Sequence, residues 1–205
     1  MEWLAQYAEF GLVNEQKLAL VFVREVGAID NATYRQLDPS ITHARARLEI
    51  HKLCDLGFIE KKGQGRNTYY IRTSKVVSLG ERLRPQGEKI PPQHGTFEIE
   101  SQPKSRNELL RELPKGLQER VAKLGKWASR EKVSQLLVDL CAFKPYSYEE
   151  LALIIQRAAK PMKDKYIKPL RLANKLFYWI PEMINHPLQK YVADPSMARS
   201  NTQKK

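Results

Sequence analysis

The sequence predicts a mainly α-helical fold with small β-hairpins, an α+β class. Three observations support it. Helical patterns of apolar residues occupy residues 14–56. Two short alternating runs around a Gly-rich tip follow over 57–72 and indicate a hairpin. Capped helical patterns and an aromatic run return over 113–193. Three helices followed by a hairpin are typical of a winged helix-turn-helix, and we expect two domains of this type.

The two patterned regions are separated by one without sustained periodicity. Between Ser74 and Leu113 the chain holds Pro85, Gly87, Pro91, Pro92, Gly95 and Pro103. Such a composition buries too little apolar surface to fold alone. We therefore predict a first domain over 1–75, a Pro/Gly-containing linker over 76–112, a second domain over 113–193 and a disordered tail over 194–205.

The first domain is expected to contain three helices and the hairpin. An amphipathic helix covers Glu15–Val26, and a short helix over 30–37 begins with a capping aspartate. The run Asp38-Pro39-Ser40 forms a turn. A longer helix over 41–56 follows, and the hairpin, or wing, lies in residues 58–72.

The second domain is expected to resemble an altered copy of the first. One helix starts near Pro114, a second runs from a serine cap over Ser129–Phe143, and the run 147–150 is a capping box that opens a third. A fourth helix starts at Pro161 and ends near Lys175, and Pro169 should bend it.

A strand pair is expected to close the second domain. Residues 176–180 form a strand ended by Pro181, and residues 186–192 return beside it. Its aromatic residues Phe177, Tyr178 and Trp179 fit a core-facing strand, with stacking of nucleic-acid bases as the alternative. The helix before it is rich in cations, which either follow phosphates or solvate a face: Lys160, Lys163, Lys165, Lys168, Arg171 and Lys175.

Length and charge limit the functional classes. With 205 residues, the chain can hold two small domains but not one large enzyme barrel. It carries 35 Lys and Arg against 23 Asp and Glu, a net charge of +12. Residues 104–192 alone carry 18 basic and 9 acidic residues. Such an excess attracts polyphosphate and favours a nucleic-acid partner, although basic proteins can also use it for solubility alone.

The expected location is the cytoplasm. No run of 18 apolar residues could cross a membrane, and no basic segment precedes an apolar one at the N-terminus. Cys54 and Cys141 are far apart, each within a predicted helix, and are interpreted as reduced, buried thiols.

The helix over 41–56 has one apolar and one polar face. Ala46, Ile50, Leu53 and Gly57 share a side and should face the core. In a helix-turn-helix the opposite arc enters the major groove, where Arg can donate two hydrogen bonds to guanine. The predicted DNA-binding residues of this helix are Thr42, His43, Arg45, Arg47, His51 and Lys52.

The hairpin tip supplies the other predicted contacts. Its glycines permit positive φ and a close approach of the backbone to phosphate. The predicted DNA-binding residues here are Lys61, Lys62, Gln64, Arg66 and Asn67. Arg45, Arg47 and His51 would approach bases, whereas Lys61, Lys62 and Arg66 would hold phosphates. The alternative is a charged, solvated surface without a ligand.

Motifs of catalysis are lacking in the sequence. It has no GxSxG nucleophile motif and no GxxxxGK[ST] phosphate loop. His51 and Cys54 have a spacing that can chelate a metal, but no second pair completes four ligands. We expect no enzyme, no metal and no cofactor.

In their order along the chain, several short motifs resemble the C-terminal part of RecG-like, AlbA- and Schlafen-type transcriptional regulators. They are Ile29–Leu37, Asp55–Glu60, Gly63–Tyr70, Tyr166–Leu170, Tyr178–Glu182 and His186–Tyr191. The resemblance implies binding of double-stranded DNA in transcriptional regulation. It also implies AlbA-like or ATP-binding domains, which this sequence lacks. On this reading, Trp3, Leu4, Tyr7 and Phe10 form the edge of a helix that packs on such a domain.

The rival hypothesis is a protein-interaction or dimerisation module. Leu48 and Ala44 lie on the outward arc, where they favour a surface covered by a partner. The partner would be a second copy of the chain or the AlbA-like or ATP-binding domain.

Overall fold

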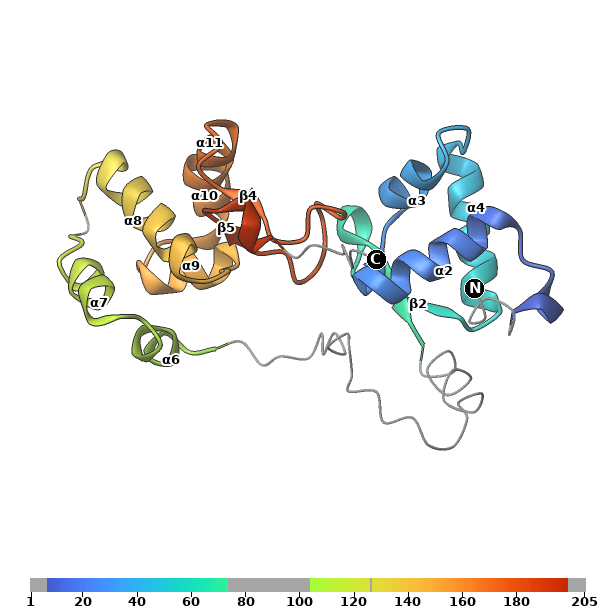
Figure 1. Cartoon of the computed structure of the whole chain (residues 1–205), viewed down its shortest axis with the longest axis horizontal. Helices are drawn as coiled ribbons and strands as arrows, with labels where there is room; N and C mark the ends of the chain where they lie inside the picture. Colours follow the sequence, from blue (N-terminus) through green and yellow to red (C-terminus); the bar gives the residue numbers. More distant parts are fainter. Residues whose placement is uncertain (1–6, 74–103, 126, 199–205) are drawn as a thin grey trace. The chain divides into compact units, whose positions relative to one another are not determined.

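The computed structural model describes residues 7–73, 104–125 and 127–198. They form a mainly helical α+β structure, as the sequence predicted, and contain one three-stranded and one two-stranded antiparallel sheet (Figure 1). The chain divides into two compact units. The first, blue to cyan-green in Figure 1, contains residues 7–73, to which Asn185–Pro187 are assigned; the second contains the other described residues. Most of the predicted linker, the end of the tail, and Trp3 and Leu4 lie outside the described residues.

The first unit contains the three predicted helices. They are α2 (Asn14–Val26), α3 (Asn31–Leu37) and α4 (His43–Asp55). Asp30 caps α3, since its Oδ1 accepts a hydrogen bond from the Thr33 amide at 2.7 Å. The turn that precedes α4 is closed by Asp38, whose Oδ1 accepts from the Ser40 amide at 2.8 Å. The hydroxyl of Thr42 caps α4.

The hairpin is present and is extended by a strand that the sequence analysis did not predict. Strands β2 (Ile59–Lys62) and β3 (Tyr69–Arg72) pair antiparallel, with Lys61 opposite Tyr70. The additional strand β1 (Ala28–Ile29) pairs with the other edge of β3 and gives the order β1-β3-β2. The sheet therefore ties the connection between α2 and α3 to the hairpin.

One apolar core holds the first unit together. The predicted inward face of α4 is confirmed, because Ala46, Ile50 and Leu53 are all buried. Tyr7 is buried as well, and its ring meets that of Phe58 edge to face at 5.1 Å. Phe10, the last residue of the 3-10 turn η1 (Ala8–Phe10), also packs on Phe58. Tyr7 and Phe10 thus pack within their own unit instead of forming the edge of a helix that covers another domain.

The second unit is built from short helices around its own core. They are α6 (Arg106–Arg111), α7 (Lys115–Ala122), α8 (Arg130–Phe143), α9 (Tyr148–Ile154), α10 (Ala159–Met162) and α11 (Lys168–Leu172). The predicted caps Ser129 and Ser147 accept hydrogen bonds from the Lys132 and Glu150 amides. Helix α6 falls inside the range predicted as linker. A capping box of Ser105 and Glu108 begins it, and its Leu109 is fully buried.

Between α10 and α11 the chain makes a π-helical turn, η3 (Lys163–Ile167). The predicted helix therefore starts two residues earlier than Pro161 and is interrupted before Pro169. Because Pro169 has no N–H, it cannot donate to the Lys165 carbonyl four residues earlier. Arg130 Nη2 donates to that carbonyl at 2.8 Å and links α8 to the interrupted helix.

A short strand pair ends the second unit. Strands β4 (Phe177–Tyr178) and β5 (Tyr191–Val192) pair antiparallel, so each lies inside a predicted strand but is much shorter. The aromatic run is half-buried, and its neighbours Leu176 and Ile180 are the buried residues. Within the predicted disordered tail, Pro195–Met197 form a 3-10 turn (η4).

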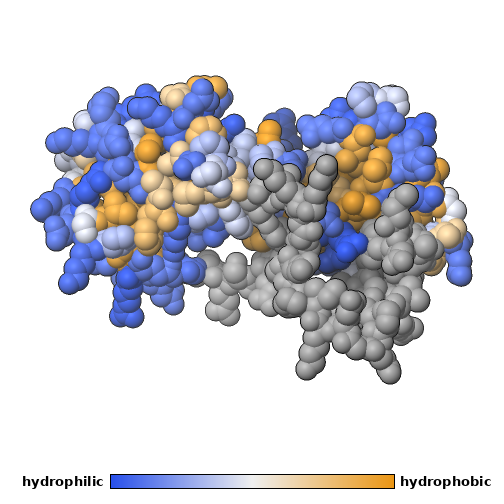
Figure 2. Space-filling model, in the orientation of Figure 1, coloured by the Kyte–Doolittle hydropathy of each residue, from blue (hydrophilic) through white to orange (hydrophobic). Residues whose placement is uncertain are grey.

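The surface of the described residues is mainly hydrophilic. Hydrophilic residues make up most of the face in Figure 2, with smaller apolar groups between them. In the part of the chain that the structure describes, no helix is long and apolar enough to cross a membrane.

Both cysteines are free and lie in helices, as predicted. Cys141 is buried, as predicted, and its burial raises the pKa of its thiol to about 12. Cys54 was also predicted to be buried, but it is only half-buried.

The hairpin tip gives a test of the fold. Gly63 has φ of +69°, and a Cβ there would lie 2.2 Å from the Asn67 carbonyl oxygen. Gly65 has φ of +56° but open space around its Cα. Gly63→Ala should therefore destabilise the first unit by about 2 kcal/mol or more, and Gly65→Ala by about 1 kcal/mol. Urea denaturation followed by circular dichroism measures both; an equal decrease in stability for the two variants would contradict the steric argument.

Candidate functional site

Helix α4 is fixed by polar as well as apolar contacts. Glu49 lies on its inner side and is only 8% exposed. The Gln16 side chain donates to Glu49 Oε2 at 2.7 Å and accepts from the Val13 amide at 3.1 Å. Lys52 Nζ lies 3.2 Å from the same carboxylate. The start of α2 is thereby joined to the middle of α4, and the outer face of α4 keeps a fixed orientation.

Cations from three elements converge on one concave surface of the first unit. We call it the basic concavity and define it by Arg35 of α3, His43, Arg47 and His51 of α4, and Lys61 and Arg66 of the hairpin. Asp30, Asn31 and Ala32 at the start of α3 also line it. Helix α4 and the hairpin tip therefore face the same side, which is the arrangement that the DNA-binding hypothesis requires.

The cations of the first unit differ in whether they have an acidic partner. Arg45 lies 3.6 Å from Glu15, and Lys62 lies 3.2 Å from Glu60. Lys52 is bound to Glu49, as described above. Among the described residues, no ion pair within 4 Å involves the four cations of the basic concavity, Arg35, Arg47, Lys61 and Arg66. Their charge is available to an anionic ligand.

All eleven residues predicted to bind DNA are exposed, but they do not form one group. Five line the basic concavity: His43, Arg47, His51, Lys61 and Arg66. Thr42 caps α4, and the Asn67 amide donates to the Gln64 carbonyl at 3.1 Å in the turn of the hairpin. The remaining three are the paired cations Arg45, Lys52 and Lys62.

Two residues of this region were not predicted from the sequence. Arg35 belongs to the basic concavity. Its place could have been predicted, because it is a cation on the short helix that the capping Asp30 begins. Glu49 lies between basic residues in the sequence and has the pattern of a surface residue. Only the tertiary contact with Gln16 shows that it is buried.

The outer side of α4 also carries an apolar strip. Leu48 is 64% exposed, and it lines one surface hollow together with Ala44, His43, Arg47 and His51. A leucine so exposed on a short helix is compatible with contact to a partner.

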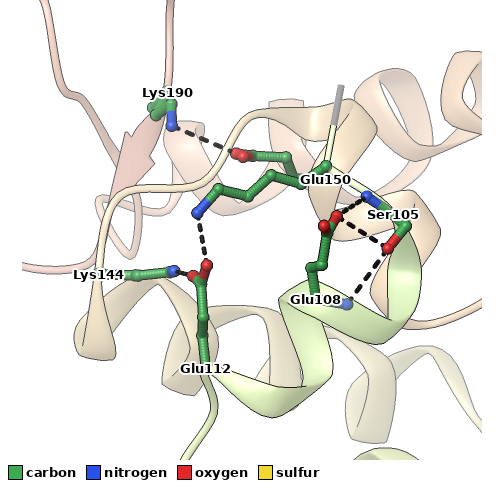
Figure 3. A network of polar contacts seen from close by, with 7 residues as sticks. Ser105, Glu108, Glu112, Lys144, Glu150 and Lys190 are labelled. Atoms are coloured by element: carbon green, nitrogen blue, oxygen red, sulfur yellow. Dashed lines mark hydrogen bonds and ion pairs between the residues drawn. The ribbon is translucent and has the colours of Figure 1, made fainter. Parts of the chain in front are cut away.

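Acidic residues of the second unit neutralise a separate group of cations. Glu112 receives hydrogen bonds from Lys104 at 2.5 Å and from Lys144, and Glu150 lies 3.6 Å from Lys190 (Figure 3). Arg120 pairs with Asp139. The hydrogen bonds from Lys104 and then from Lys144 hold the pKa of Glu112 at about 2.

No family model, no curated protein and no solved structure matches this chain. Within residues 7–73, 104–125 and 127–198, no group of three or more His, Cys, Asp or Glu residues is arranged to hold a metal ion.

The Glu112 network predicts a pH dependence. A carboxyl whose pKa falls on folding stabilises the folded state above its unfolded pKa, near 4.5, and this contribution disappears as the pH falls toward 2. Glu112→Gln should therefore lower the urea midpoint at pH 7, and its difference from the wild type should shrink between pH 4.5 and pH 2. Glu119→Gln, which changes an exposed acid of α7, is the control. A difference that is constant with pH would contradict the assignment.

Proposed function

We propose that this chain binds double-stranded DNA through a winged helix-turn-helix formed by its first unit, with α4 as the recognition helix and β2–β3 as the wing. The observation that carries the proposal is the basic concavity, where unpaired cations of α3, α4 and the hairpin face one side. DNA carries a dense row of phosphates that such cations neutralise with release of counterions.

Each part of the basic concavity suits a different part of the duplex. Arg47 projects from the exposed arc of α4 and can donate two hydrogen bonds to guanine, which would discriminate by about 1–3 kcal/mol against other bases. Lys61 and Arg66 project from the hairpin, where they suit phosphates beside the groove. His43 and His51 flank Arg47 along the same helix face and add hydrogen-bonding groups. Arg45, Lys52 and Lys62 contribute less, since an acid already accompanies each.

The biological role that fits this binding is transcriptional regulation, as the resemblance to RecG-like and AlbA-type regulators implies. The second unit, with its short helices and strand pair, is proposed as an altered winged-helix-type domain of the same chain.

The proposal is tested by removing the unpaired cations together. Arg47→Ala, Lys61→Ala and Arg66→Ala in one variant should weaken binding to a labelled random duplex. In a plot of the logarithm of the association constant against the logarithm of the salt concentration, the magnitude of the slope should fall by about 0.9 for each phosphate that the variant no longer neutralises. Fluorescence anisotropy between roughly 50 and 200 mM salt measures both. The control carries the same charge change at Arg111, Lys115 and Lys123. Equal behaviour of the two variants would reject the basic concavity as the DNA site.

The second candidate function is a protein-interaction module, and the exposure of Leu48 favours it. In this case α4 docks on a second copy of the chain or on an AlbA-like or ATP-binding domain. Sedimentation would then find a dimer that is insensitive to salt and that Leu48→Glu dissociates. A monomer with salt-dependent duplex affinity would instead exclude self-association through Leu48.

A further inference from the structure

We propose that the helical segment α10–η3–α11 of the second unit is a second, sequence-independent binding site for the sugar-phosphate backbone of nucleic acid. We call it the lysine segment and define it as residues 159–175. The site is distinct from the basic concavity, because it belongs to the other unit and shares no residue with it. Four observations carry the proposal.

The first observation is that the lysines of this segment take no part in the described ion pairs of the second unit. Its ion pairs join Lys104 and Lys144 to Glu112, Lys190 to Glu150, and Arg120 to Asp139. The lysine segment contains six basic residues and one acid, Asp164. Among the described residues, none of its five lysines lies within 4 Å of a carboxylate. The described ion pairs of the unit thus involve none of these five lysines, and the segment keeps a high density of positive charge.

The second observation is that these lysines are presented to solvent. Lys160, Lys163, Lys165, Lys168 and Lys175 are all exposed, whereas Met162, Ile167 and Leu170 fix the opposite side of the segment in the core. The fourteen residues from 159 to 172 extend about 20 Å along the helix axis, which is enough to follow several phosphates.

The third observation is a cation supplied by a neighbouring helix. Arg130, at the start of α8, donates from Nη2 to the Lys165 carbonyl at 2.8 Å. Its guanidinium therefore lies against the lysine segment, and its remaining N–H groups can still donate. The side chain that compensates for the missing N–H of Pro169 thus adds positive charge to the same surface.

The fourth observation concerns which polyanion fits. An amphipathic helix that lies on a membrane presents a continuous apolar face beside its cations. Here Met162, Ile167 and Leu170 are buried in the core, and the exposed Leu172 is too small an apolar area to form such a face. Lysine is a compact, hydrated point charge that suits phosphates, and base edges are recognised better by arginine or amide groups. Arg171 is the segment's own arginine, and its guanidinium is stacked on the Tyr178 ring at 3.4 Å. The surface therefore favours backbone contacts without base selection.

The test changes Lys160, Lys165 and Lys168 to Gln in the full chain. Anisotropy with a labelled random duplex should show weaker binding by about tenfold or more at low salt and a slope of log K against log salt reduced by about two to three. Changing the duplex sequence should leave this decrease the same. The matched control is Arg111→Gln, Lys115→Gln and Lys123→Gln in the same unit, and circular dichroism checks that each variant is folded.

The outcomes separate this proposal from that of the basic concavity. If only the lysine variant binds more weakly, the lysine segment is the binding site and the basic concavity is not. If only the Arg47, Lys61 and Arg66 variant binds more weakly, the inference for the second unit is overturned. It is also overturned if the lysine variant matches its control, or if the chain binds phosphatidylserine vesicles through these lysines and does not bind duplex.

Discussion

The short length of the helices governs the structure of both units. Among the helices of the described residues, even the longest, α8, has 14 residues, and α3 and α9 have seven each. Helices of this length are marginal in water, so their stability must come from burying one face and satisfying their ends. In α4, one face is buried through Ala46, Ile50 and Leu53. The opposite face is not needed for packing and is free to bind a ligand. The exposed charges of α4 and of the lysine segment lie on faces that the core does not need.

This constraint explains which parts of the fold could be predicted from sequence. Helix starts have local chemical signals, so Asp30, Ser129 and Ser147 were assigned correctly as caps. The buried face of α8 followed from its periodicity. Strand β1 was missed because two residues carry no pattern, and α6 because its capping box lies beside a Pro-rich stretch. The π-helical turn involves Pro169 together with Arg130, which is distant in the sequence.

The candidate sites show the same limit. Composition and helical periodicity identified Arg47, Lys61 and Arg66 as exposed cations. They could not indicate which cations have an acidic partner, since Arg45 meets Glu15 only when α2 and α4 pack together. For Arg45 the pairing is a tertiary property, whereas Lys52 pairs with Glu49 and Lys62 with Glu60, acids three and two residues away in the sequence. The presence or absence of an acidic partner separates the residues of the basic concavity from their neighbours.

The π-helical turn also determines which residues of its segment face the core. In an α-helix, residues five apart are rotated by about 140° around the axis, so Met162 and Ile167 could not both face the core. Hydrogen bonds across five residues bring them to the same side. A single deletion between them would leave a spacing of four residues, which an ordinary α-helix also places on one side, so α11 would keep its orientation. Relatives of this chain with one residue fewer here should therefore have a continuous α-helix in place of the π-helical turn. A single insertion would instead make the spacing six residues, about 120° apart in an α-helix, and would turn Lys168 and Leu170 of α11 away from their present sides.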